Sequence, residues 1–244
     1  MELRILRYES LPSTNTEALS QARKGAPEGL CVVADEQTEG RGRHGRTWVS
    51  APGAGLYFSA VLRPKLEPRD LPLLTLASAV AVNDVLKELY DISTDIKWPN
   101  DLLVEGRKIA GILAETTETE DGTAVVVGIG INLRSSHLPE ELASASASVE
   151  SETGAQGDRD ELLERLVRYF FFHCERTATA SGRDRVLKEW SARSSYGRGK
   201  HVRVDAAGKR IEGITDGIDG HGALIIRTAD GTETVQAGDV TALR

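Results

Sequence analysis

Hydrophobic residues follow two different patterns along this chain, and the change between them divides the sequence into two parts. Up to about residue 194, short apolar runs typical of buried strands alternate with longer segments whose apolar residues recur at helical spacing. From Tyr196 onward only short alternating segments remain, separated by closely spaced turns. We therefore predict a larger domain over residues 1–194 and a small one over 195–244.

Helical spacing predicts several helices in the first domain. One begins at Thr14, where Thr14 and Glu17 match a capping box, and it ends at Gly25. A second, over residues 70–90, carries an apolar stripe wide enough for a core helix without chemistry of its own. Two more are predicted over residues 160–179 and 183–191, the first of them capped by Asp160.

Apolar runs bounded by turn residues predict the strands. They fall at residues 30–34, 56–62, 92–97 and 124–133, with a hairpin over 102–115. Residues 124–133 are apolar throughout, which predicts a central strand covered on both faces. Gly128 and Gly130 leave alternate positions of this strand bare, so a ligand or a neighbouring backbone can come close. Residues 135–157 are rich in Ser, Ala and Glu and predict a mobile connector with at most a short helix near 139–143.

The second domain reads as a small antiparallel barrel. Its short strands alternate apolar and polar residues, and glycine-containing turns separate them. The strands are predicted over residues 201–204, 210–214, 223–227 and 232–235.

Charge and composition narrow the class of protein. The chain has 37 acidic and 30 basic side chains and a net charge of −7, which argues against a protein whose main partner is a nucleic acid. Its two cysteines form no metal or disulfide pattern, so we expect buried, reduced thiols. No secretory signal opens the sequence, and no run approaches the roughly 18 apolar residues of a membrane span. We therefore expect a cytoplasmic protein that binds neither nucleic acid nor a membrane.

Residues 40–48 contrast with this acidic background. They hold three arginines, one histidine, three glycines and no acid, and Trp48 closes the segment. Glycine lets a backbone wrap closely around a ligand, and arginine supplies a planar charged fork for carboxylates and phosphates. The segment suits a loop that binds an anionic nucleotide. A flexible RNA-binding segment and a solvated turn remain open from these residues alone.

Taken in order, the motifs of the chain resemble the biotin protein ligase family. The motifs that carry the resemblance are Ser13–Asn15, Gln37 with Gly40–Trp48, Lys97–Asp101, Arg107–Leu113 and Gly128–Asn132. The resemblance covers nearly the whole chain and implies an α+β fold. It implies a catalytic biotin- and ATP-binding domain over 1–194, similar to class II aminoacyl-tRNA synthetases, with a mixed β-sheet flanked by helices. Residues 195–244 would then form an SH3-like barrel.

The activity implied by the resemblance is that of a biotin–[biotin carboxyl-carrier protein] ligase. Such an enzyme couples biotin to ATP, makes biotinyl-5′-AMP, and transfers biotin to one lysine of the biotin carboxyl carrier protein of acetyl-CoA carboxylase or a related carboxylase. Biotin, ATP and Mg²⁺ are the implied small molecules, and the magnesium ligands are not assigned. Family members often form homodimers, which this sequence neither requires nor excludes. Only 12 residues precede Ser13, too few for the helix-turn-helix of some members, so we expect no operator binding.

The chemistry of individual residues fits this reaction. Biotin's carboxylate must attack the α-phosphorus of ATP, so cations must offset the repulsion between two anions. We expect four catalytic residues: Arg43, Lys108, Lys97 and Asp101. The expected binding residues are Ser13, Thr14, Asn15 and Gln37 at the ureido ring; Gly40, Arg41, Gly42, Arg43, Arg46 and Trp48 in a loop that closes over the intermediate; and Asn100, Lys108, Gly111, Ile112, Gly128, Gly130 and Asn132.

Several roles stay open at this point. Ser13–Asn15, taken alone, favour simple helix capping over ligand binding. For Trp98 we favour core packing, and for Lys97 a phosphate contact over a salt bridge at the end of a strand. Asp101 either positions magnesium or orients a lysine, and Asn132 either closes a turn or binds nucleotide. Trp48 could stack on adenine.

Two rival functions follow from the same residues. A lipoate ligase or octanoyl transferase shares the catalytic architecture, but the complete Arg- and Gly-rich loop argues against it. A non-catalytic module could instead bind RNA or protein through the loop and the barrel, although the acidic balance weighs against RNA.

Overall fold

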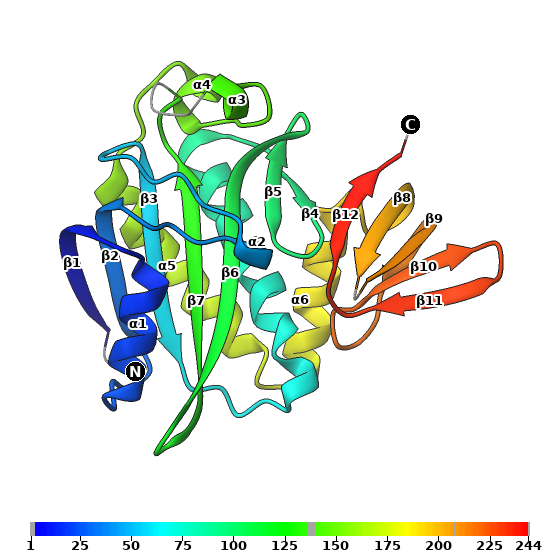
Figure 1. Cartoon of the computed structure of the whole chain (residues 1–244), viewed down its shortest axis with the longest axis horizontal. Coiled ribbons are helices and arrows are strands. Elements are labelled where there is room, and N and C mark those ends of the chain that lie inside the picture. Colours follow the sequence, from blue (N-terminus) through cyan, green and yellow to red (C-terminus); the bar gives the residue numbers. More distant parts are fainter. Residues whose placement is uncertain (1–2, 136–139, 207, 244) are drawn as a thin grey trace.

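Two sheets organise the molecule (Figure 1). The computed structural model describes residues 3–135, 140–206 and 208–243. A seven-stranded sheet has the strand order β1-β2-β3-β7-β6-β5-β4, and a five-stranded sheet has the order β11-β10-β9-β8-β12. In the first sheet β1 and β2 are parallel and every other neighbouring pair is antiparallel, so the sheet is mixed, as predicted.

The elements follow one another in a simple order. Those of the larger domain are β1 Arg4–Leu11, α1 Thr14–Arg23, β2 Leu30–Gln37, η1 Arg43–Gly45, β3 Gly55–Leu62, η2 Pro68–Asp70, α2 Pro72–Tyr90, β4 Asp95–Lys97, β5 Asp101–Val104, β6 Arg107–Thr119, β7 Gly122–Asn132, α3 Glu140–Ala143, α4 Val149–Thr153, α5 Arg159–Arg176 and α6 Ala180–Ala192. The barrel comprises β8 Arg198–Ala206, β9 Lys209–Ile218, β10 Leu224–Thr228, β11 Gly231–Val235 and β12 Asp239–Ala242. The predicted division after residue 194 falls between α6 and β8 and remains our assignment.

The two faces of the large sheet differ in what covers them. Side chains alternate along a strand, so Val125 and Val127 of β7 join the core formed with α2, α5 and α6. Val126 points to the opposite face and joins a smaller core with α1. Gly128 and Gly130 continue that second face, so β7 carries no side chain there between Val126 and Asn132. This bare stretch of the α1 face leaves space over the sheet for groups from other elements.

The barrel is joined to the larger domain by specific contacts near the start of α2. The buried indole of Trp98 donates from Nε1 to the carbonyl of Gly222 at 3.0 Å. His221 lies beside Asp70, with 2.5 Å between His221 Nδ1 and Asp70 Oδ1. The prediction that Trp98 packs in the core is confirmed, since its side chain is 1 % exposed.

Replacing Trp98 with alanine should lower the free energy of unfolding by about 3–5 kcal/mol, because the cavity left by a buried indole cannot fully collapse. Trp98→Phe keeps most of the volume but loses the bond to Gly222, and should cost about 1–2 kcal/mol. Urea unfolding followed by circular dichroism measures both changes. Equal midpoints for the alanine variant and the wild type would show that this contact does not hold the barrel in place.

Some predicted helix starts are wrong. Thr14 and Glu17 do not form a capping box: Ser13 is the N-cap of α1 and makes no side-chain cap bond. The Thr14 hydroxyl instead faces Gln37 and Ser59, within 3.1 Å and 2.7 Å of their polar atoms. Helix α5 is capped by Asp158 rather than Asp160, because the Asp158 carboxylate accepts the two free amides of the first turn.

Some elements were not predicted. The edge strand β1, the last barrel strand β12 and the short helices η1 and η2 were overlooked. Helix α2 was predicted but begins two residues later than expected. Within the predicted connector, residues 136–139 lie outside the described part. The short helix near residue 143 is present as α3, and α4, which a Ser148 capping box begins, was missed.

Two other expectations concern the cysteines and membrane spans. Cys31 and Cys174 are both buried and free, as predicted. Burial raises the pKa of each thiol to about 12, so both remain protonated and unreactive at neutral pH. Across the described ranges, no helix has the length and apolar character needed to cross a bilayer.

Candidate active site

The predicted binding motifs meet in one cavity on the α1 face of the large sheet. Helix α1 and the loop after β2 form one side, and strands β3, β5, β6 and β7 form the floor. The lining residues include Ser13, Thr14, Asn15, Gln37, Arg41, Gly42, Arg43, Arg46, Thr47, Trp48, Tyr57, Asn100, Asp101, Lys108, Gly111, Ile112, Leu113, Gly128 and Gly130. Sequence segments more than 100 residues apart therefore build a single site.

The polar end of the cavity is a connected hydrogen-bond network. The backbone amide of Thr14 donates to Gln37 Oε1 at 2.8 Å, and Gln37 Nε2 donates to the Ser50 hydroxyl at 2.7 Å. The Ser59 hydroxyl lies 2.6 Å from Asn15 Oδ1 and 2.7 Å from the Thr14 hydroxyl. The side chains of Ser13–Asn15 therefore line the cavity and make no cap bond to α1, which supports the pocket-facing alternative for them.

Space left by the glycines of β6 and β7 is filled by side chains from other elements. A Cβ atom at Gly130 would lie 2.5 Å from the Trp48 indole, and one at Gly128 would lie 2.1 Å from Asn15 Oδ1. At Gly111 a Cβ would lie 2.9 Å from both Trp48 and Lys108. The glycines thus seat an indole, an amide and an ammonium group on the sheet, and these groups in turn form the wall of the cavity.

Trp48 is central to this wall. Its indole lies against Gly111 and Gly130, and Lys108 Nζ is 5.1 Å from its ring centroid, within the range of a cation–π contact. Indole Nε1 is buried and has no hydrogen-bond partner among the described residues. Ile112 differs: its side chain belongs to the core on the opposite face, so only its backbone can border the cavity.

Lys108 is held at the floor of the cavity by Asp101, with 2.6 Å between Lys108 Nζ and Asp101 Oδ1. Lys97 lies directly across the β4–β5 pair from Asp101. One carboxylate therefore faces two lysines. This arrangement supports the alternative in which Asp101 orients a lysine.

Asp101→Asn should lower the rate of adenylate formation about 10- to 100-fold, because the ammonium group of Lys108 loses the partner that positions it. The dissociation constant for biotin should change far less. Single-turnover formation of labelled adenylate measures the rate. If Asp101 instead holds magnesium, raising the magnesium concentration would restore the rate of the variant, and the positioning role would be wrong.

The arginines of the loop are paired with acidic and carbonyl oxygens from distant elements. Arg41 forms an ion pair with Glu115 of β6. Arg43 Nη1 donates to Asn100 Oδ1 at 3.2 Å and to the carbonyl of Gly238 at 3.1 Å. Arg46 Nη2 donates to Asp239 Oδ1 at 2.8 Å, so the loop also touches the barrel.

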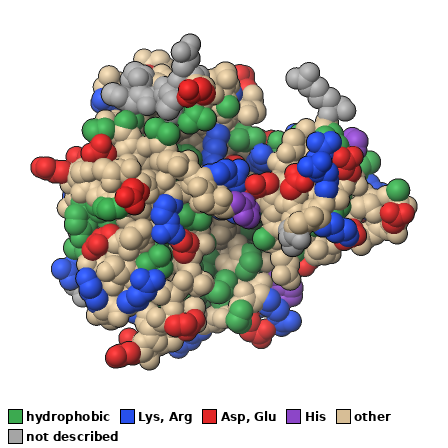
Figure 2. All heavy atoms as spheres, in the orientation of Figure 1, with side chains coloured by type: hydrophobic (Ala, Val, Ile, Leu, Met, Phe, Trp, Pro, Cys, Tyr) green, Lys and Arg blue, Asp and Glu red, His purple; other side chains and the backbone are tan. Residues whose placement is uncertain are grey.

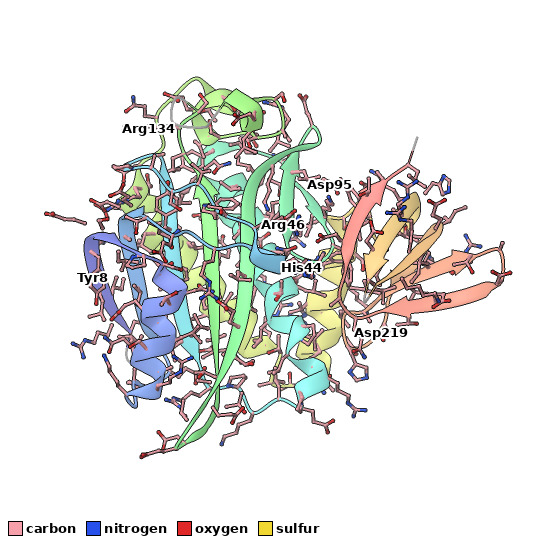
Figure 3. All side chains as sticks on the ribbon, viewed as in Figure 1. Tyr8, His44, Arg46, Asp95, Arg134 and Asp219 are labelled. Carbon is pink, nitrogen blue, oxygen red and sulfur yellow. The ribbon has the colours of Figure 1, made fainter. Side chains whose placement is uncertain are left out.

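Charged groups gather where the loop meets the barrel. Figure 2 shows basic, acidic and histidine side chains meeting over the middle of this face, and Figure 3 places His44 and Arg46 between the large sheet and the barrel. His44 Nε2 lies 3.9 Å from Asp239 Oδ1. His44 also has a φ of 55°, a left-handed conformation that turns the loop sharply.

Burial affects two cations of this region. Desolvation lowers the pKa of Arg43, although nearby Asp239 acts in the opposite direction. Desolvation also lowers the pKa of Lys97, while Asp101 opposes the effect. Poorly hydrated cations of this kind attract an incoming anion more strongly than fully hydrated ones do.

Three predicted site residues do not line the cavity. Gly40 packs against the Trp48 carbonyl, where a Cβ atom would lie only 2.2 Å away. Lys97 Nζ lies 6.0 Å from the centroid of the Tyr196 ring. Asn132 donates from Nδ2 to the carbonyls of Lys108 and Ala147 at 3.2 and 3.0 Å, so its amide fastens β6 to the segment before α4.

Four contributors to the site were missed by sequence reasoning. Ser59 and Tyr57 were hidden in an apolar strand, although their spacing of two residues could have placed them on one face. Glu115 ends the predicted hairpin and was given no partner. Asp239 lies in the barrel, and no local signal links it to Arg46.

The chain is similar in sequence to known biotin protein ligases over nearly its whole length. The Biotin/lipoate A/B protein ligase family matches residues 8–132, and the Biotin protein ligase C terminal domain matches residues 198–241. The biotin--[acetyl-CoA-carboxylase] ligase of Paracoccus denitrificans is 36% identical over 234 residues, covering 93% of this chain and 96% of that protein. The bifunctional ligase/repressor BirA of Bacillus subtilis (strain 168) is 35% identical over 239 residues, covering 97% of this chain and 73% of that protein.

The fold agrees with these matches. The biotin protein ligase of Aquifex aeolicus in complex with biotin and ATP aligns with a TM-score of 0.86 at 29% identity, covering 99% of each chain. The chain therefore belongs to the Biotin/lipoate A/B protein ligase family. Within that family it is a member of the biotin protein ligases, and the predicted α+β class with a mixed sheet and an SH3-like carboxy-terminal domain is confirmed.

Proposed function

We propose that this chain activates biotin with ATP and transfers it to a lysine of a carrier protein. The observation that supports the proposal most directly is the composition of the cavity. One end offers hydroxyl and amide groups to a cyclic urea, and the other presents Lys108 and the arginines of the loop. A molecule with a urea ring at one end and a carboxylate at the other matches that sequence of groups.

The first step joins two anions. A biotin carboxylate oxygen attacks the α-phosphorus of ATP, the bond from that phosphorus to the bridging oxygen breaks, and pyrophosphate leaves. Lys108 supplies a compact positive charge at the carboxylate, and Arg41, Arg43 and Arg46 supply forks for the phosphates. In the structure, Glu115 forms an ion pair with Arg41, and Asp239 forms ion pairs with both Arg43 and Arg46. Closure of the loop then shields the mixed anhydride from water.

Magnesium is proposed as the companion of ATP. Among the described residues, no group of three or more His, Cys, Asp or Glu side chains could hold a metal ion. This agrees with the usual behaviour of Mg²⁺, which keeps several waters and binds through substrate phosphates and one or two carboxylates. When bound, it would neutralise charge on the phosphates. Asp101 is the carboxylate of the cavity floor, and its ion pair with Lys108 argues against a metal-binding role.

The second step needs an acceptor. The amine of a carrier lysine attacks the carbonyl carbon of biotinyl-5′-AMP, an amide bond forms, and AMP leaves. We propose the biotin carboxyl carrier protein of acetyl-CoA carboxylase or a related carboxylase as this acceptor. The relatives named for acetyl-CoA carboxylase support the choice.

The proposal is tested by mass spectrometry of a purified carrier domain incubated with the chain, biotin, ATP and magnesium chloride. We expect the carrier to gain one biotinyl group, only when all four components are present. Replacing biotin with lipoate or octanoate tests the related lipoyl activities. Modification of the carrier with lipoate but not with biotin would overturn the assignment. Salt-sensitive RNA binding without any transfer of biotin to the carrier would also overturn it.

We also propose that the chain is cytoplasmic, where its proposed substrates are found.

We propose further that the chain forms a homodimer through β1. Strand β1 pairs only with β2, and the described residues include no strand on its other edge. Leu3 and Ile5 are 46 % and 39 % exposed beside that edge. In an antiparallel pairing centred between residues 6 and 7, Arg4 would face Glu9 of the second copy, and cross-strand pairs of opposite charge are favourable. Sedimentation velocity showing a monomer at every concentration would overturn this pairing.

A further inference from the structure

Ser59 is a fully buried serine in the middle of the apolar strand β3. Its neighbours Phe58 and Ala60 join the core with the helices, so Ser59 points to the α1 face. Gly128 stands opposite it on β7, and the missing side chain there makes room for Asn15. A hydroxyl at a fully buried position is unfavourable unless it is hydrogen-bonded. Here it has two partners, and both belong to the cavity wall.

The direction of each hydrogen bond can be deduced from the available protons. Asn15 Nδ2 lies 3.1 Å from the Leu113 carbonyl and 2.9 Å from Glu115 Oε2. Both are acceptors, which fixes the orientation of the Asn15 amide and leaves Oδ1 toward Ser59. Because Oδ1 has no hydrogen, the only proton of Ser59 must go to Asn15.

The proton of Thr14 is fixed by the same reasoning. Ser59 Oγ and Thr14 Oγ1 are 2.7 Å apart, a distance that needs a hydrogen between them. Since the Ser59 proton goes to Asn15, the Thr14 hydroxyl must donate to Ser59. Gln37 Oε1, at 3.1 Å from the same hydroxyl, already accepts the backbone amide of Thr14 at 2.8 Å.

The result is a cavity wall with fixed polarity. Thr14 Oγ1 and Asn15 Oδ1 can offer only lone pairs to a ligand, because the Thr14 hydrogen goes to Ser59 and an amide oxygen has no hydrogen. Gln37 keeps one amide hydrogen after its bond to Ser50, and the Ser13 hydroxyl caps no helix amide. Two acceptors and two donors are the complement of a cyclic urea, which carries two N–H groups and one carbonyl.

We infer that Ser59 is a positioning residue that makes this cavity select a cyclic urea over other ring systems at the end of an acid. The inference rests on the proposed function. Ser59 acts through Thr14 and Asn15, whose acceptor character it enforces. A dithiolane or alkyl acid has no N–H groups and leaves these acceptors unpaired, which strongly disfavours binding.

Ser59→Ala should raise the Michaelis constant for biotin about tenfold, with little change in kcat or in the Michaelis constant for ATP. Dethiobiotin keeps the cyclic urea, so its Michaelis constant should rise by the same factor. If the wild type releases pyrophosphate slowly with lipoate, that rate should not fall in Ser59→Ala. The variant should therefore discriminate less between biotin and lipoate. Steady-state pyrophosphate release with each acid measures these changes.

Ser78→Ala is the matched control. Ser78 is also fully buried, but it lies on α2 and its hydroxyl donates to the Leu74 carbonyl at 2.6 Å. The same atom is removed far from the cavity, so the Michaelis constant for biotin should not change. Combining Ser59→Ala with Asn15→Ala should cost less than the sum of the single changes, because Ser59 acts through Asn15.

Ser59→Cys provides a second variant in case the alanine variant does not fold. A thiol donates weakly, so calorimetric binding of biotin should be weaker than in the wild type. Wild-type chain that never modifies a carrier with biotin would refute the proposed function. If the wild type is active and Ser59→Ala leaves the Michaelis constant for biotin unchanged, the inference is wrong while the ligase assignment stands. If only Ser59→Cys folds, an unchanged dissociation constant for biotin in that variant has the same meaning.

Discussion

Lys108→Gln is expected to reduce biotin-dependent pyrophosphate release about 100- to 1000-fold, a loss typical of a group that stabilises developing charge. Lys108 is the compact cation at the cavity floor, and Asp101 at 2.6 Å and the Trp48 ring fix its position. Glutamine keeps a similar length and polarity but carries no charge. The biotin carboxylate and the phosphates then approach each other without a cation between them. Single-turnover adenylate formation at saturating biotin and ATP measures the loss.

Two variants sharpen this prediction. Lys87→Gln removes the same charge from an exposed lysine that pairs with Asp91, and it should leave the rate unchanged. Lys108→Arg keeps the charge but replaces a compact ammonium with a wider fork, so we expect a partial loss. A rate within threefold of wild type for Lys108→Gln would show that the arginines alone manage the charge of the reaction.

The strands that sequence reasoning found are those with a strong burial signal. Strand β7 is covered on both faces, so nearly all its residues are apolar, and the run is unmistakable. Strand β1 lies at the edge of the sheet and is mostly exposed, with charged residues among the apolar ones. Its strand character comes from backbone pairing with β2, which leaves little trace in the side chains. Strand β12 has only four residues and is held in the same way by β8.

The residues of the site also differ in how easily the sequence reveals them. Motifs dense in polar and glycine residues, such as residues 40–48, were recognisable because their composition stands out from the acidic chain and because several of them occur in a family-like order. Ser59 was not recognisable, since one small polar residue in an apolar strand is unremarkable until its partners are known. Asp239 could be paired with Arg46 only through the packing of one domain on the other. Local sequence carries no information about such distant contacts.

The glycines illustrate what a sequence pattern can specify. Gly128 and Gly130 were expected to leave room for a ligand, and the alternation along β7 placed them correctly on one face. The sequence pattern identified the two positions without a side chain, but it did not identify the groups that fill the space above them. Asn15 and Trp48, from two other elements, occupy it. A missing Cβ atom marks a close approach, and only the fold reveals which group approaches.

Gly130→Ala is expected to weaken biotin binding about 10- to 100-fold, as overpacking of a few kcal/mol does when a wall group is displaced. The added Cβ atom would lie 2.5 Å from the Trp48 indole, closer than atoms can pack, so the ring must leave the sheet. Trp48 then occupies the cavity or turns outward, and either movement disturbs Lys108, which lies 5.1 Å from the ring centroid. Calorimetric titration with biotin measures the change.

Gly220→Ala is the matched control for this substitution. Gly220 lies in a barrel loop where a Cβ atom would meet nothing within 4 Å, so binding and stability should remain close to wild type. Adding Trp48→Phe to Gly130→Ala shortens the displaced ring and should restore part of the binding, because the smaller side chain can share the space with the new methyl group. Unchanged biotin affinity in Gly130→Ala would mean that the indole can leave the sheet without disturbing the site. Trp48 would then be a neighbour of the biotin pocket rather than its wall.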